Sequence, residues 1–171
     1  MTPLGWIRRA KDERGTAVVE MALVLPILLL LALGVGGFGV GLNRKNDATQ
    51  LANVGARWAA VNANPAGIPL GTPSGSCSVS GTTLQDVIRS QADTCGMYNT
   101  STVCIDFPDG IQKVGHPVEV KVKTNWTWLG VQFFPKSLSF SNLTIVGRAV
   151  MRLEQQPPPG TPFHFTADPG C

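Results

Sequence analysis

The stretch from residue 16 to residue 42 reads TAVVEMALVLPILLLLALGVGGFGVGL and sets the architecture of the whole chain. It holds one ionisable residue, Glu20, and as a helix it is long enough to cross the roughly 30 Å of bilayer hydrocarbon. A cleaved secretory signal has a shorter apolar core and a small-x-small cleavage site close behind it, whereas this run continues into Asn43, Arg44 and Lys45. We therefore predict a signal anchor that stays in the membrane rather than a conventional signal peptide.

Basic residues concentrate just before this run. Residues 1–15 carry Arg8, Arg9, Lys11 and Arg14 against Asp12 and Glu13. Because positive residues flank membrane spans on the cytoplasmic side, the N-terminus is expected in the cytoplasm and the chain after residue 42 outside. The net charge of +3 is small, and the basic residues form no patch with interleaved aromatic residues, which argues against nucleic acid as a partner.

Two features of the apolar run exceed what an anchor needs. An ionised carboxylate at Glu20 costs free energy in hydrocarbon, so a residue of this kind usually has a partner. Glycines stand at positions 34, 36, 37, 39 and 41, and Gly37 with Gly41 forms a GxxxG pair that would let another helix pack closely. The glycines are equally well explained as ordinary residues of a membrane helix.

A motif lies where the basic segment meets the apolar run. It reads Arg14-Gly15-Thr16-Ala17-Val18-Val19-Glu20-Met21-Ala22-Leu23-Val24-Leu25-Pro26. It resembles the class III signal of type IV pilin-like proteins, in which a glycine precedes the cleavage site and a glutamate is the fifth mature residue. The whole string, with the leucine run behind it, is similar to the TadE and TadG group of the tight adherence pilus system, and Gly55-Ala56-Arg57-Trp58-Ala59-Ala60 resembles a second signature of that family. The Phe-Thr-Leu-Ile-Glu motif of typical pilins is absent.

The resemblance implies a processing and assembly role. A prepilin peptidase would cut after Gly15, and the new ammonium group of Thr16 would pair with Glu20 of a neighbouring subunit. The implied partners are the membrane, the prepilin peptidase, other pilin-like subunits and the Tad assembly platform. The implied location is the bacterial cytoplasmic membrane, crossed once.

Beyond the membrane, the sequence predicts an α+β fold with a long N-terminal helix packed on a small antiparallel sheet. Ala48, Leu51, Ala52, Gly55 and Ala59 recur at helical spacing, so the helix is expected to run from Thr16 through an extension at 43–63. An extracytoplasmic domain is expected at 64–154, with a loop to residue 82, a short second helix over 84–95 that begins at a Thr83–Asp86 capping box, and three or four strands.

The strands are predicted from residues that alternate in polarity. Apolar side chains recur at every second position in three stretches, which are Val103 to Phe107, Val118 to Val122, and Leu143 to Leu153 with an interruption at Gly147. Pro108-Asp109-Gly110 predicts a turn. The last stretch, 155–171, is rich in proline and is expected to be disordered.

Four cysteines, Cys77, Cys95, Cys104 and Cys171, all follow the apolar run, which suits disulfides in an oxidising compartment. They allow three pairings, and the sequence does not choose among them; Cys171 would take the remaining thiol of this chain or one of another chain. There is no CxxC motif, and His116 and His164 have no metal-ligand pattern around them, so neither a metal nor a cofactor is expected.

No catalytic motif is present, which predicts a protein that is not an enzyme and has no small-molecule substrate. The aromatic residues Trp126, Trp128, Phe133 and Phe134 are expected to cover the core, with a partner surface as the alternative. Two functions compete: a processed minor pseudopilin of a Tad pilus, and an uncleaved, membrane-tethered scaffold or binding protein nearer to TadG.

Overall fold

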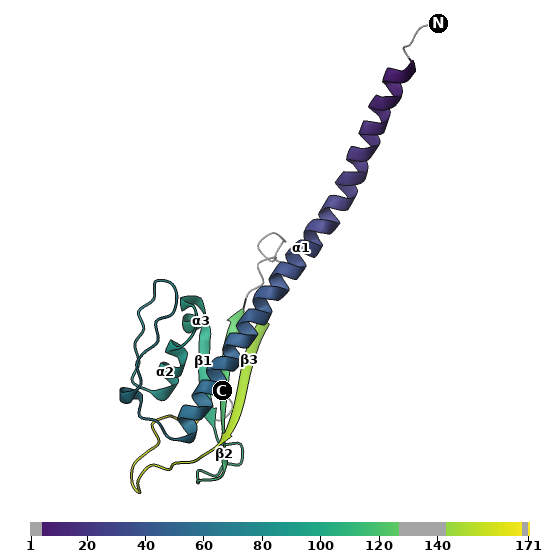
Figure 1. The fold of residues 1–171 in the computed structure, drawn as a ribbon. Coiled ribbons are helices and arrows are strands. Elements are labelled where there is room, and N and C mark those ends of the chain that lie inside the picture. Colours follow the sequence, from purple (N-terminus) through teal and green to yellow (C-terminus); the bar gives the residue numbers. More distant parts are fainter. Residues whose placement is uncertain (1–4, 127–142, 169–170) are drawn as a thin grey trace. The chain divides into compact units, whose positions relative to one another are not determined.

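The computed structural model describes residues 5–126, 143–168 and 171, and for residues 5–14 it describes the backbone alone. The chain divides into two units, Met1–Gly39 and Val40–Cys171. Helix α1, Gly5–Ala60, supplies residues to both units. The second unit is an α+β domain in which the last part of α1, two short helices and a three-stranded sheet pack together, which confirms the predicted fold class (Figure 1).

Both ends of α1 differ from the prediction. The helix begins at Gly5 instead of Thr16, and it ends at Ala60 instead of Ala63. Asn62 explains the end, because it adopts a left-handed φ of 46° that asparagine tolerates better than most residues. The amides of Asn62 and Ala63 then donate to the carbonyls of Ala59 and Trp58, at 3.1 and 2.9 Å, which is a Schellman motif.

The sheet contains strands β1 (Ser101–Asp106), β2 (Pro117–Trp126) and β3 (Leu143–Arg152), in the spatial order β1-β2-β3. Both pairs are antiparallel, with Val103 opposite Val122 and Trp126 opposite Leu143. The alternating residues of β2 follow the prediction, because Val118, Val120 and Val122 are fully buried. The turn at Pro108-Asp109-Gly110 is also present, with Gly110 at a φ of 65° and its amide donating to Phe107.

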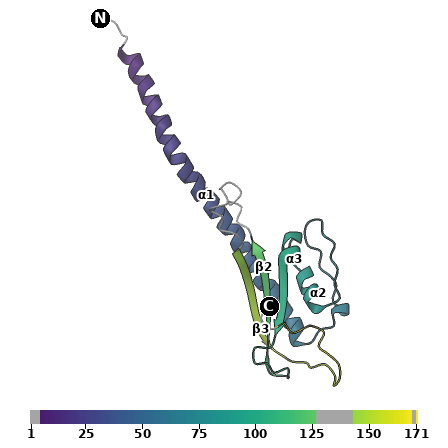
Figure 2. The same cartoon turned by 180° about the vertical axis from the view of Figure 1, so that it is seen from behind.

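The sheet lies along the C-terminal part of α1 (Figures 1 and 2), and the buried helix residues there are mostly small. Ala48, Ala52, Ala56 and Ala59 of the helix are fully buried. Gly147 was predicted to interrupt the last strand, but β3 runs through it without a break. A Cβ at this position would overlap the carbonyl of Ala48, so the glycine lets the strand and helix backbones approach each other closely.

The predicted helix over 84–95 is in fact two helices, α2 (Leu84–Ser90) and α3 (Cys95–Thr100). The capping box at the start of α2 is confirmed, since the Thr83 hydroxyl accepts from the amide of Asp86 and the Asp86 carboxylate accepts from the amide of Thr83. The helices separate because Thr94 caps a new one, with its hydroxyl accepting from the amide of Met97. Gly96 therefore lies inside α3. The loop before α2 contains a 3₁₀ turn, η1 (Pro65–Gly67).

The C-terminal stretch differs from the expected disordered tail. The rings of Phe163 and Phe165 lie 5.4 and 5.9 Å from that of Phe107, centroid to centroid. Ala167 pairs with Ile105 at the edge of β1, where the amide of Asp168 donates to the Ile105 carbonyl at 2.9 Å. The aromatic residues between the prolines supply apolar contacts that offset the cost of ordering this stretch.

Candidate processing and assembly site

Gly15 lies inside α1, so the bond between Gly15 and Thr16 is part of a continuous helix. Gly15 is exposed, and a Cβ added there would meet no described atom within 4 Å. A peptidase needs an extended substrate, and the helix must therefore unwind locally before this bond can be cut. Glycine favours such unwinding, because it stabilises a helix by about 1 kcal/mol less than alanine does.

Thr16 and Glu20 are four residues apart in α1 and therefore share one face of the helix. Both residues are exposed, as are the residues on either side of Glu20. Helical side chains lean toward the N-terminus, so the carboxylate of Glu20 is directed toward the turn that begins at Thr16. The structure thus brings the two predicted assembly residues together on one surface.

Large apolar side chains surround these residues and continue to the end of the predicted span. Eighteen residues of this part of α1 have a mean hydropathy of 2.7, and none of them is buried. Val18 and Leu31, for example, are 69% and 61% exposed. Among the described residues, α1 is the one helix that is long and apolar enough to cross a membrane.

The predicted helix-packing pair, Gly37 and Gly41, lies further along α1. A Cβ at Gly41 would lie 3.3 Å from the ring of Trp126, at the end of β2, so Gly41 contacts the sheet of its own chain. Contact with a second helix through Gly37 and Gly41 remains a prediction. Of the other aromatic residues that the sequence singled out, Trp128, Phe133 and Phe134 lie outside the described residues.

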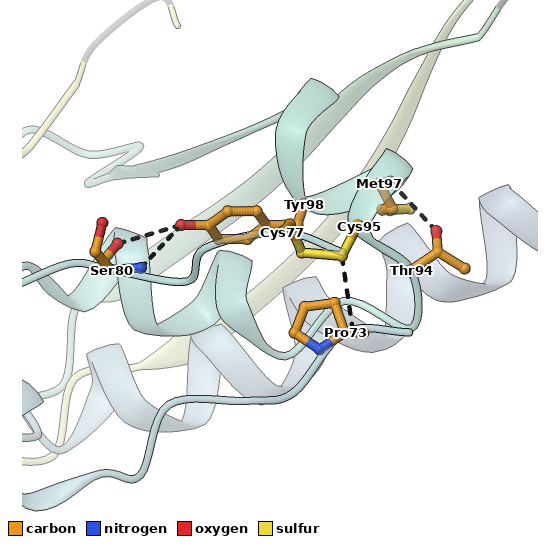
Figure 3. Close-up of a disulfide and its surroundings, with 7 residues drawn as sticks. All are labelled: Pro73, Cys77, Ser80, Thr94, Cys95, Met97 and Tyr98. Carbon is orange, nitrogen blue, oxygen red and sulfur yellow. Dashed lines mark hydrogen bonds between the residues drawn. A yellow bond between two sulfur atoms is a disulfide. The ribbon is translucent and has the colours of Figure 1, made fainter. Parts of the chain in front are cut away.

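Two disulfides join the four cysteines. Cys77 pairs with Cys95, at the start of α3, across a Cα separation of 5.6 Å. Figure 3 shows this disulfide beside Tyr98, whose hydroxyl donates to the carbonyl of Ser80 and accepts from its amide at 3.2 and 3.3 Å. The disulfide and the tyrosine together fix the loop before α2, which has no strand pairing beyond a single bridge between Ser74 and Thr94.

Cys104, in β1, pairs with Cys171 across a Cα separation of 5.8 Å. This bond holds the C-terminal stretch at the edge of β1, next to the pairing between Ile105 and Ala167. Cys171 therefore finds its partner within this chain, one of the two alternatives that the sequence left open.

Charged side chains in the described part of the domain form small local groups. Glu119 is almost fully buried and pairs with Arg148 and with Lys121, the latter at 3.4 Å. Asp106 accepts from the amide of Phe107 at 2.8 Å, which is a turn contact. The described residues contain no group of three or more His, Cys, Asp or Glu side chains that would hold a metal ion.

Comparison with known families gives one match. The model of the family described as "TadE-like protein" matches residues 15–57, about a quarter of the chain. No curated protein and no solved structure matches. The match begins at Gly15 and ends at Arg57, so it covers the first motif from Gly15 onward and the first half of the second motif, Gly55-Ala56-Arg57. The N-terminal segment of this chain, residues 15–57, is therefore a TadE-like segment.

Proposed function

We propose that this chain is a minor pseudopilin of a Tad pilus system, processed by a prepilin peptidase after Gly15. The TadE-like segment indicates a membrane component associated with such a system, and the start of the family match at Gly15 is the observation that carries the finer proposal. The role is structural: the protein joins other pilin-like subunits and the assembly platform, and it carries out no reaction of its own.

The proposed location is the bacterial cytoplasmic membrane, with the N-terminus in the cytoplasm. The basic residues before Thr16 support this orientation through the positive-inside rule. The disulfides Cys77–Cys95 and Cys104–Cys171 also support it, because such bonds persist outside the reducing cytosol. The part of the chain after residue 42 is then extracytoplasmic.

Thr16 and Glu20 have separate tasks in this proposal. After cleavage, the α-ammonium of Thr16 is a cation at the membrane surface, and Glu20 is a carboxylate within the apolar run. Pairing between the ammonium of one subunit and the carboxylate of its neighbour removes the penalty for a lone charge in lipid. This pair fixes the register of the subunits, while the exposed apolar side chains of α1 supply the affinity.

One observation favours the alternative, an uncleaved and membrane-tethered scaffold or binding protein. Helix α1 runs unbroken from Gly5 across the bond between Gly15 and Thr16, which is not the extended form that a peptidase requires. In this alternative, residues 1–15 remain attached and α1 serves only as a tether.

The two functions are separated by the N-terminus of the mature protein. The chain is expressed with and without the cognate prepilin peptidase, and its intact mass and N-terminal sequence are measured after membrane extraction. We expect a chain that begins at Thr16 only when the peptidase is present. A chain that keeps residues 1–15 in both cases would contradict the pseudopilin proposal and favour the tether.

Two glycine variants make this experiment specific. Gly15→Ala adds a methyl group at the cleavage site and strengthens the helix there, so cleavage should be strongly reduced. Gly34→Ala is the matched control, because it also adds a methyl group to α1 where no described atom lies within 4 Å. Equal cleavage of the two variants would show that Gly15 is not the recognised residue.

A further inference from the structure

One end of the sheet lies beside the last residues of the apolar run. Trp126 closes β2 and is paired with Leu143, the first residue of β3. We call these two residues the sheet tip. The ring of Trp126 packs against Gly41 of α1, which belongs to the run from residue 16 to residue 42.

The strands follow the axis of α1 away from this point. Gly41 faces Trp126, Ala48 faces Gly147, and Gly55 faces Val120, so the contacts recur every seven residues of the helix. From Gly41 to Gly55 a helix rises about 21 Å. From Trp126 to Val120 a strand covers about 20 Å. The two distances agree, and the sheet tip is therefore level with Gly41 along the helix.

Three large apolar side chains are exposed at this level, beside the polar residues Asn125 and Thr144. Leu143 is 59% exposed, and Val40 and Leu42 on α1 are 41% and 49% exposed. Tryptophan is enriched where membranes meet water, because its ring is apolar and its indole N–H needs a polar partner. Large exposed aliphatic side chains beside such a residue suit a lipid environment better than water.

A backbone carbonyl of the edge strand β3 also has a hydrogen-bond donor near the sheet tip, as a lipid environment requires. The ammonium of Lys45 donates to the carbonyl of Val146, three residues after Leu143. A backbone carbonyl near hydrocarbon needs a hydrogen-bond donor, and Lys45 is one for Val146. Lysine also keeps a second chain from pairing with the edge of β3 at this point.

From these contacts we infer that the sheet tip is a lipid-binding surface, inserted in the outer interface of the bilayer that α1 crosses. Leu143 and Trp126 lie among the phospholipid glycerol and upper acyl groups, and the domain rests directly on the membrane. The inference depends on the proposed membrane span, because Gly41 marks the outer border of the bilayer only if α1 crosses it.

Site-directed spin labelling tests the inference on the full chain in nanodiscs of phosphatidylcholine and phosphatidylglycerol. The four native cysteines are in disulfides, so Leu143→Cys offers a single thiol to a nitroxide. Collisions with oxygen report lipid, and collisions with a water-soluble nickel complex report water. Val150→Cys is the matched control on the same strand, since Val150 is 48% exposed but lies beyond the level of Gly55. Leu29→Cys marks the apolar run.

We expect the oxygen-to-nickel accessibility ratio at residue 143 to be several-fold higher than at residue 150 and to approach that at residue 29. A ratio equal to that at residue 150, with residue 29 in lipid, would overturn the inference and leave the membrane span intact. Low accessibility to both reagents at residue 143 would also overturn it, because protein would then cover the sheet tip. Exposure of residue 29 to water would refute the span itself.

Discussion

Helix α1 has two kinds of surface on one continuous backbone. From Val18 to Leu42 its large apolar side chains are exposed, up to 74% at Val35. From Ala48 to Ala60 its buried positions are mostly alanine, and the sheet approaches them closely enough to require Gly147. Large side chains suit contact with lipid or another subunit, whereas small ones let strands lie against the helix backbone. The difference shows that one helix is built for two surroundings.

Placing charge in the first surface should have the largest effect. Each change from leucine to arginine near the middle of a span costs about 3 kcal/mol of insertion, so Leu28→Arg with Leu30→Arg should cost about 6 kcal/mol. The fraction of the chain that resists alkaline extraction from membranes should fall sharply. Asn46→Arg with Asn53→Arg adds the same charges to exposed positions of α1 beyond the apolar run, and should leave anchoring unchanged. Similar anchoring of both double variants would argue against the membrane span.

Removing a disulfide should act on the domain alone. Cys104→Ser with Cys171→Ser opens a loop with a sequence separation of 67 residues, which should lower the free energy of unfolding by about 4 kcal/mol. Guanidinium unfolding of the detergent-solubilised chain measures this loss. Cys77→Ser with Cys95→Ser, across 18 residues, should cost about 3 kcal/mol. Membrane anchoring should survive in both variants; its loss would mean that the two parts of α1 are not independent.

The close approach of sheet and helix can be tested at Gly147. Gly147→Ala places a methyl group on the carbonyl of Ala48, and backbone on both sides limits relaxation, so the domain should lose about 2 kcal/mol of stability. Gly34→Ala adds the same methyl group to α1 where the described structure has open space, and should not change the unfolding of the domain. If Gly147→Ala unfolds like the natural chain, the strand and helix are further apart than the structure places them.

Local sequence patterns were enough to predict several features of the fold and the candidate site. The apolar run identified the first part of α1, and the alternation at Val118, Val120 and Val122 identified the buried face of β2. The motif from Gly15 to Glu20 identified the candidate site, and the family match starts at that glycine. Each of these signals lies in residues that are neighbours in sequence.

Contacts between distant residues were beyond such patterns. Gly147 resembles a strand break until the carbonyl of Ala48 is known to lie against it. Phe163 and Phe165 lie in a proline-rich stretch, and the sequence of that stretch does not show that their rings pack against Phe107. The disulfide pairing depends on the same fold. Asn62 was a missed local signal, because an asparagine just beyond a run of helical residues is a common C-terminal cap.

Asp47 lies between the two surfaces of α1 and should give the smallest effect, one that depends on pH. Burial raises the pKa of Asp47 above its ordinary value of 3.8, and the charge of Asp93 raises it further, against a backbone hydrogen bond from Asp93 and the charge of Arg44. The fold therefore prefers protonated Asp47, and its stability falls as the pH rises from the unfolded-state pKa through the higher folded-state pKa. Asp47→Asn should then be more stable than the natural chain at pH 7, and the gain should vanish below about pH 3.8, where both states carry the proton. Thermal unfolding across this pH range measures the difference. Asp93→Asn removes only the charge of Asp93, so it should also stabilise the chain at pH 7, but by less than Asp47→Asn does. If the gain in stability from Asp47→Asn persisted unchanged at low pH, titration of Asp47 would be excluded as its origin.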